Sequence, residues 1–170
     1  ICMIGGLLST IASPVNAQKR VARFEKEFQK TLALVNSDQF TVKFYIATPT
    51  VQTLFTPPGA GANIDINPQA CYLSMNDSLV TSKLPYFGRA AWTSKSQLDS
   101  ISINNVLFSR TVKIYQDGKK QAIAYQITVR TGEDIYYLNM DIQYDGTFYL
   151  YFSDRKRAPI SYVGQITKRD

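Results

Sequence analysis

Histidine is absent from this chain of 170 residues, and cysteine, methionine and tryptophan occur only twice, three times and once. Without imidazole the chain lacks Ser-His-Asp and Cys-His nucleophile systems, imidazole general bases and nearly all catalytic zinc sites. It also contains no P-loop, G-x-G-x-x-G, H-E-x-x-H, C-x-x-C or EF-hand motif. We therefore expect a protein that is not an enzyme and that uses no metal ion and no cofactor.

One kind of hydrolysis needs none of these missing residues and motifs, namely catalysis by a pair of carboxylates as in glycosidases. The candidate acids are Asp65, Asp77, Asp99, Glu133, Asp134, Asp141 and Asp154. Most of them fall in turns, where solvation and turn propensity already explain acidic residues. A carboxylate hydrolase is therefore the third hypothesis, behind two non-catalytic ones.

The first seventeen residues have the layout of an export signal. Residues 1–12 form a short apolar run, and small residues then stand at the −3 and −1 positions before Gln18. The run falls well short of the roughly 20 apolar residues that span a bilayer. We predict a signal-peptide remnant over 1–17 that is cleaved after Ala17. The mature chain is then one periplasmic or secreted domain over 18–170, without a transmembrane segment.

Charge and cysteine usage narrow the partners. The chain carries 19 basic and 13 acidic residues, a net charge of +6, with local clusters at 19–23 and 155–157. In an exported protein we expect no nucleic acid as a partner, and the clusters either contact an anionic envelope surface or form a solvated face. After cleavage only Cys71 remains, so stability must come from packing rather than from an internal disulfide. We expect this thiol to be buried and inert.

Residues 18–36 carry a helical pattern. Apolar side chains recur at three- and four-residue spacing, and basic and acidic side chains fill the other side. The stripe consists of Val21, Phe24, Phe28, Leu32 and Val35. We expect this amphipathic helix to pack against a sheet, with a membrane-surface helix as the alternative. Asn36-Ser37-Asp38 then ends the pattern.

The middle of the chain alternates strands with irregular segments. Phe40, Val42, Phe44 and Ile46 alternate with polar residues, so 39–47 is predicted to be a half-buried strand. A loop rich in proline and glycine fills 48–67, and strands follow around 70–75 and 78–84. We expect a further short strand at 100–103 that turns at Asn104-Asn105.

The second half of the chain forms hairpins whose registers follow from the phase of the apolar residues. Paired residues share a face of the sheet, so apolar residues must stand opposite apolar residues. A two-residue turn at Asp117-Gly118 would pair Val112 with Ile123 and Phe108 with Ile127. The loop at Gly132-Glu133 pairs Ile127 with Leu138 and Val129 with Tyr136. A three-residue loop over 144–146 pairs Ile142 with Phe148 and requires a left-handed Gly146.

These elements predict a mainly β fold. Roughly eight or nine strands form an antiparallel meander with one apolar face, and the N-terminal helix packs on it. The sequence leaves a closed barrel and a strongly curled sheet as alternatives. Tyr137, Tyr149 and Tyr151 lie on the opposite face, which is a candidate partner surface.

The candidate site is an aromatic corner at 84–92. Tyr86, Phe87 and Trp92 can form an aromatic wall, and Arg89 can anchor an anionic or sugar-like ligand. Leu54 and Phe55 interrupt the long loop with apolar side chains and complete the candidate set. The alternative is structural: the aromatic residues plug one end of a barrel, and Arg89 meets a carboxylate.

A resemblance rests on two stretches within this frame. Leu84-Pro85-Tyr86-Phe87-Gly88-Arg89-Ala90 and Arg157-Ala158-Pro159-Ile160-Ser161-Tyr162-Val163-Gly164 resemble the exported Bacteroidetes family called domain of unknown function 4251. The helix, the strand and turn over 72–77 and the Asp145-Gly146 hairpin extend the resemblance over nearly the whole mature chain. It implies an envelope or secreted protein with no established activity or cofactor. The chain departs from the family at 92–97, where glycine-rich sequence is usual.

Two functions from different classes remain. The first is a binding module that holds a small apolar or amphipathic ligand at the barrel mouth or the 48–67 loop. The second is an envelope interaction protein that docks a partner through its tyrosine-bearing face or basic helix. An internal apolar cavity favours the first function, whereas a packed interior with an exposed patch favours the second.

Overall fold

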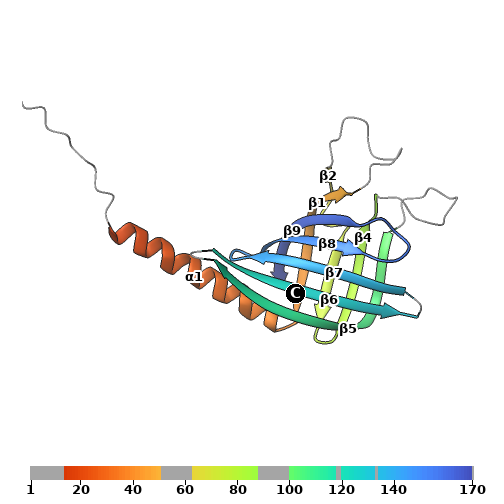
Figure 1. Cartoon of the computed structure of the whole chain (residues 1–170), viewed down its shortest axis with the longest axis horizontal. Helices are drawn as coiled ribbons and strands as arrows, with labels where there is room; N and C mark the ends of the chain where they lie inside the picture. The colour runs from red at the N-terminus through yellow and green to blue at the C-terminus, as the bar shows by residue number, and fades with distance from the viewer. Residues whose placement is uncertain (1–13, 51–62, 88–99, 118–119, 133, 170) are drawn as a thin grey trace, which may run out of the picture.

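Nine antiparallel strands and one helix make up the part of the chain that the structure describes (Figure 1). The structure is a computed structural model, and it describes residues 14–50, 63–87, 100–117, 120–132 and 134–169. The elements are α1 (Pro14–Asn36), β1 (Phe40–Pro49), β2 (Ile64–Asp65), β3 (Tyr72–Asn76), β4 (Leu79–Pro85), β5 (Ser100–Asp117), β6 (Lys120–Thr131), β7 (Asp134–Gln143), β8 (Thr147–Ser153) and β9 (Ile160–Lys168). Eight strands close into a barrel, and β2 adds a short ninth strand beside β1.

The barrel closes because β9 returns beside β1. Their antiparallel ladder runs from Phe40, which stands opposite Lys168, to Pro49, which stands opposite Ile160. Closure removes the exposed edges that an open sheet would leave. The predicted mainly β class is confirmed, and of its two alternatives the structure has the closed barrel.

Gly164 allows this seam between β1 and β9 to form. It stands opposite Phe44 on β1 and Phe148 on β8, whose rings meet edge to face with centroids 5.5 Å apart. A Cβ atom on Gly164 would overlap the carbonyl oxygen of Lys43 and lie 2.9 Å from two ring atoms of Phe148. Any larger residue would therefore push β1 away from β9.

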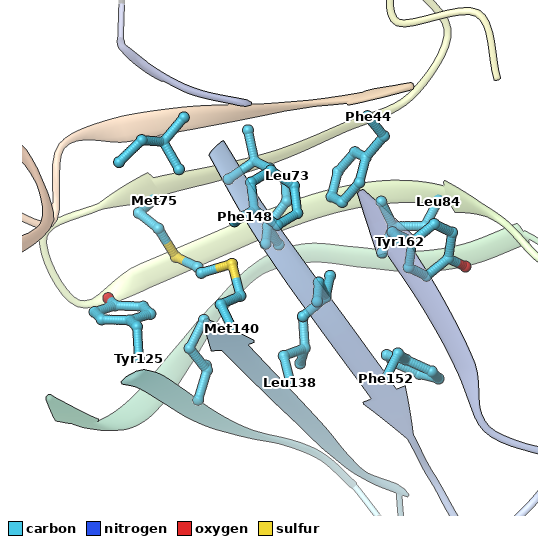
Figure 2. Packing of buried hydrophobic residues seen from close by; sticks show 14 of the residues in the cluster. Phe44, Leu73, Met75, Leu84, Tyr125, Leu138, Met140, Phe148, Phe152 and Tyr162 are labelled. Carbon is cyan, nitrogen blue, oxygen red and sulfur yellow. The ribbon is translucent and has the colours of Figure 1, made fainter. Parts of the chain in front are cut away.

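Side chains from all eight barrel strands fill the interior (Figure 2). Figure 2 shows Met75 and Met140 pointing toward each other from different strands. The ring of Phe44 contacts Tyr162 as well as Phe148, with centroids 5.4 Å apart in the first pair. Each fully buried apolar side chain of this size contributes roughly 1.5–3 kcal/mol to folding. The largest fully buried side chains are Tyr125, Tyr162, Phe40, Phe44, Phe152, Leu73, Met75, Leu84, Ile101, Ile103, Ile123 and Ile127.

Two of the three predicted hairpin registers are confirmed. Ile127 pairs with Leu138 across the Gly132-Glu133 loop, and Ile142 pairs with Phe148 across the three-residue loop. Gly146 has the required positive φ of 83°. The register of the first hairpin is wrong by two residues, although the faces are correct. Val112 pairs with Tyr125, because the two strands continue until Asp117 stands opposite Lys120.

Two β-bulges were not predicted. The segment 100–103 is the start of the long strand β5 and does not turn at Asn104-Asn105. Asn105 instead has a φ of 53°, and its N–H donates to the hydroxyl of Thr81 at 3.2 Å. A second register shift lies between Phe44 and Ile46, so Ala47 rather than Ile46 is buried. An extra residue reverses the phase of the side chains that follow it.

The helix packs on the barrel with its C-terminal half. It begins at Pro14, earlier than predicted, and proline suits the first turn because its missing N–H has no helical partner there. Phe28 and Val35 are buried, but Val21 is 51% exposed, so the predicted apolar stripe is core only toward its C-terminal end. The described residues include no helix that is both long and apolar enough to cross a bilayer.

We predict that Gly164→Ala lowers the free energy of unfolding by about 2–3 kcal/mol, because the added methyl group overpacks the seam. Urea denaturation followed by circular dichroism measures the loss. Val163→Ala is the matched control, since it changes a partly exposed side chain on the outer side of the same strand. We expect a loss below about 1 kcal/mol for the control. Equal losses in the two variants would contradict the assigned role of Gly164.

Candidate functional site

Part of the predicted aromatic corner lies at the end of the barrel where β4 ends and β9 begins. Tyr86 is 3% exposed, and Phe87 is half-buried and packs against the core. Four predicted site residues lie outside the described residues, namely Leu54, Phe55, Arg89 and Trp92. The structure therefore brings only Tyr86 and Phe87 together, and a ligand-binding role for the six residues stays a prediction.

Two tyrosine hydroxyls tie β4 to the loop before β9 and to β9 itself. Tyr86 donates a hydrogen bond to the carbonyl oxygen of Ala158 at 2.9 Å, and Tyr162 donates one to the carbonyl oxygen of Pro85 at 2.8 Å. Burial raises the pKa of Tyr86 to about 12 and also raises the pKa of Tyr162. Both phenols are therefore protonated donors at neutral pH, as an anchor requires.

An ion pair between Asp154 and Arg157 completes this barrel end. One carboxylate oxygen of Asp154 accepts from the Arg157 guanidinium at 2.6 Å, and the other accepts from the backbone N–H groups of Lys156 and Arg157. The guanidinium carbon lies 5.7 Å from the ring centre of Tyr86, a cation–π geometry. Burial alone would lower the pKa of Arg157, but the hydrogen bond and charge of Asp154 outweigh it, so the pKa is raised.

This cluster of Tyr86, Tyr162, Asp154 and Arg157 was not predicted as a unit. Its only local sign in the sequence is the three-residue spacing between Asp154 and Arg157, which is typical of a turn. The contact with Tyr86 joins residues far apart in the chain. The Asp154 and Arg157 side chains are 3% and 19% exposed. Because these charges already satisfy each other, the cluster supports a structural role better than a catalytic one.

The opposite end of the barrel repeats this combination of residue types. Asp38 accepts a hydrogen bond from the Tyr125 hydroxyl at 2.7 Å and forms an ion pair with Arg110, whose Nε lies 2.8 Å from a carboxylate oxygen. Burial first, and the hydrogen bond and charge of Asp38 next, raise the pKa of Tyr125. The backbone of Asp38 also accepts from Asp77 N–H at 3.0 Å, so the residue connects the helix, β3, β5 and β6. The polar groups of this cluster are therefore also satisfied by contacts within the fold.

A cleft of about 510 Å³ lies between α1 and the turn before β8. Phe24 and Tyr144 meet edge to face there, with ring centroids 4.8 Å apart. The charged residues of the lining are Arg20, Arg23, Glu27 and Asp145. Two positive and two negative side chains give the cleft no net preference for an anion or a cation.

Four exposed tyrosines gather on the outer side of β1, β3 and β8, around Val163 of β9. Tyr149 on β8 stands opposite Val163 on β9, and Tyr45 occupies the bulge of β1 beside that pair. Tyr72 on β3 stands opposite Lys43 of β1. Their exposed fractions range from 36% to 48%. We define the tyrosine face as Tyr45, Tyr72, Tyr149, Tyr151 and Val163.

The sequence identified only part of this face. Tyr137, Tyr149 and Tyr151 were assigned to the outward phase of β7 and β8, and all three are exposed as predicted, although Tyr137 on β7 lies outside the set defined above. Tyr45 and Tyr72 were missed because their strands lie far from β8 in the sequence. Only the closure of β9 onto β1 brings the four strands together. Cys71 is buried as expected, and burial raises the pKa of its thiol.

Similarity to known proteins was found at two levels. The family model named DUF4251, a domain of unknown function, matches residues 22–166. The curated proteins include no match. Among solved structures the chain is similar to a DUF4251 family protein from Bacteroides eggerthii DSM 20697, with a TM-score of 0.62 and 9% sequence identity. The likeness covers 87% of this chain and 91% of that chain, and at this identity it shows the fold alone.

The buried ion pair predicts a specific sensitivity at this barrel end. Asp154→Asn should lower the free energy of unfolding by about 3 kcal/mol, because it leaves the largely buried guanidinium of Arg157 without a counter-charge. Asp134→Asn is the matched control at the same end, since Asp134 pairs with Lys156 in a more exposed ion pair. The control should lose less than about 1 kcal/mol. Denaturant unfolding measures both losses. Similar losses of unfolding free energy in the two variants would show that the Asp154 pair is no stronger than a surface ion pair.

Proposed function

The chain belongs to the DUF4251 family, a domain of unknown function, and from this premise we propose that it is an exported, non-enzymatic docking module. Its partner is an acidic protein of the cell envelope, and its contact surface is the tyrosine face. The observation that carries the proposal is the gathering of four exposed tyrosines on β1, β3 and β8, outside an interior that side chains fill.

The filled interior favours docking over the alternative of a ligand held inside the barrel. An eight-stranded barrel is just wide enough either to be packed by its own side chains or to hold one small ligand. In this chain the ring of Phe44 contacts the rings of both Phe148 and Tyr162 within the interior. A ligand there would have to displace several large side chains whose burial stabilises the fold.

Tyrosine on the outside of a sheet suits protein recognition. Its ring supplies a large apolar contact area, and its hydroxyl stays hydrogen-bonded to water or to a partner. Tyrosine is also enriched among the residues that dominate the binding energy of interfaces. On this face the Tyr149 hydroxyl donates to Ser161 Oγ at 2.6 Å, which holds one ring in a defined orientation.

The charge around the tyrosine face selects the kind of partner. Tyr72 stands between two lysines in register, with Lys43 opposite it on β1 and Lys83 opposite it on β4. All three residues are exposed, and the chain as a whole carries a net charge of +6. Complementary charge steers association and disfavours partners of the same sign. An acidic protein surface therefore fits this face better than a basic one.

Export and the absence of catalysis are parts of the same proposal. The apolar run and the small residues before Gln18 support export. A non-catalytic role is supported by the lack of histidine and by the ion pairs that two of the candidate acids form. Asp134 and Asp154 are each held in an ion pair, which disfavours a carboxylate that must exchange protons with a substrate.

We expect a photo-crosslinking residue at Tyr72 to capture one acidic envelope protein in the native host. Mass spectrometry identifies the adduct and the peptide that carries it. Reversing the charge of both flanking lysines, with Lys43→Glu and Lys83→Glu, should reduce the crosslink at least about tenfold, because like charges then face each other.

The same crosslinking residue at Val21 is the control, since this side chain is 51% exposed but lies on α1 and belongs neither to the tyrosine face nor to β5. It should not give the same adduct. Identical adducts from both positions, or an adduct that survives the charge reversal, would contradict the proposal. A crosslink to polysaccharide instead of protein would replace it with glycan binding.

A further inference from the structure

The far half of β5 has a hydrogen-bonded neighbour on one edge only. β5 pairs with β4 as far as Leu107, and from Phe108 onward it pairs with β6. The segment 109–116 therefore borders β6 on one side, and no other strand of the described part pairs with its opposite side. Figure 1 shows β5 continuing well beyond the start of β4. This segment is the free edge of an otherwise closed sheet.

The direction of its backbone groups follows from one hydrogen bond. Phe108 N–H donates to the carbonyl oxygen of Ser78 at 3.1 Å, so it points away from β6. In an antiparallel strand, alternate residues direct their N–H and C=O groups to the same edge. Arg110, Val112, Ile114 and Gln116 therefore direct these groups to the free edge. Such a row of unpaired groups is a template for another strand.

The side chains along this edge are exposed on both faces of the strand. Ile114 is 54% exposed and Tyr115 is 55% exposed, and Lys113 between Val112 and Ile114 is also exposed. Proteins protect free edges with proline, with bulges, with very short strands or with lysine. Residues 109–116 contain no proline and no register shift, and their charged side chains are Arg110, which is paired with Asp38, and Lys113.

We infer that the free edge of β5 binds an extended acidic segment of another protein by strand addition. The backbone of the incoming segment pairs with the outward N–H and C=O groups of Val112 and Ile114. Its apolar side chains then lie beside these two residues, and an Asp or Glu between them lies opposite Lys113. Alternating apolar and polar residues with a central acid are the sequence that this edge selects.

Charge supports an acidic occupant. Arg110 is already committed to Asp38, with Nε 2.8 Å from a carboxylate oxygen. Lys113, by contrast, has no ion pair within the described residues. The net charge of +6 adds a long-range attraction for an acidic chain. A carboxylate opposite Lys113 would be the first counter-charge at this position.

The same lysine disfavours a second copy of this chain as the occupant. Antiparallel self-pairing that sets Val112 opposite the Ile114 of the other copy would set Lys113 opposite its own equivalent. Like charges in direct cross-strand positions are destabilising. The inference does not depend on the tyrosine face, because the two surfaces share no residue.

A capped seven-residue peptide of alternating valine and threonine, with glutamate in place of the central threonine, tests the inference. We expect saturable binding to the full chain, measured by fluorescence anisotropy with a labelled peptide at low salt. N-methylation of the valine amides, which face β5 in this pairing, should weaken binding at least about tenfold by removing two or more hydrogen bonds. N-methylation of the threonine amides should change it less than about twofold.

Two protein variants complete the design. Lys113→Glu should weaken binding of the glutamate peptide about threefold and strengthen binding of a central-lysine peptide by a similar factor. Ile114→Pro removes an N–H that the β5–β6 ladder does not use, so the fold should persist while binding is lost. Circular dichroism checks the fold of this variant, and the methylated peptides test the same edge if it fails to fold.

Three results would overturn the inference. The first is equal binding of the two methylated peptides, which would show that backbone pairing is not involved. The second is no detectable binding of the glutamate peptide at a peptide concentration of about 1 mM, because a few paired hydrogen bonds should give a dissociation constant below that concentration. The third is a dimer in sedimentation experiments that Ile114→Pro abolishes, which would make a second copy the occupant.

Discussion

The pairing of β9 with β1 is the constraint on which the rest of the structure depends. It turns a meander of neighbouring hairpins into a barrel, and it requires a residue without a side chain at Gly164. Through this seam Tyr45 and Tyr72 come beside Tyr149, so the same pairing that encloses the apolar interior assembles the outer tyrosine face. Fold and proposed docking surface thus have one physical origin.

Polar clusters hold the two ends of the barrel. At each end an aspartate forms an ion pair with an arginine whose guanidinium lies over a buried tyrosine ring, 5.9 Å away for Arg110 and 5.7 Å for Arg157. Such groups are expensive to bury unless they are fully paired, and here they are paired with each other. This arrangement leaves their charges satisfied within the fold. By contrast, the tyrosine face and the free edge of β5 present exposed side chains and unpaired backbone groups that a partner can contact.

Sequence patterns predicted local structure well and long-range structure poorly. The phase of the apolar residues correctly placed Ile127 opposite Leu138, and it required the left-handed Gly146. The bulge at Tyr45 was missed because Ile46 continues the apolar alternation through it. The phase of the apolar residues does change at Asn104-Asn105, but it was interpreted as a turn rather than as a bulge. The first hairpin was placed two residues out of register because both registers keep apolar residues on one face.

The candidate site was predictable only in part for the same reason. Tyr86 was identified from its aromatic surroundings, but its contacts with Ala158 and Arg157 cross most of the chain and leave no local pattern. The free edge of β5 could not be predicted, because its existence depends on where β4 begins relative to β5. Features set within one strand or one tight hairpin could be predicted, whereas features set by strands that are separated by long segments of the sequence could not.

Native-state hydrogen exchange of the seam amides tests the central claim most directly. The account predicts that the hydrogen-bonded amides of β1 and β9 exchange only through global unfolding, with opening free energies equal to the free energy of unfolding measured by denaturant. Exchange of these amides through a local opening of much lower free energy, while β6 and β7 remain protected, would contradict it. The barrel would then be an open sheet whose edge strands, β1 and β9, pair only transiently.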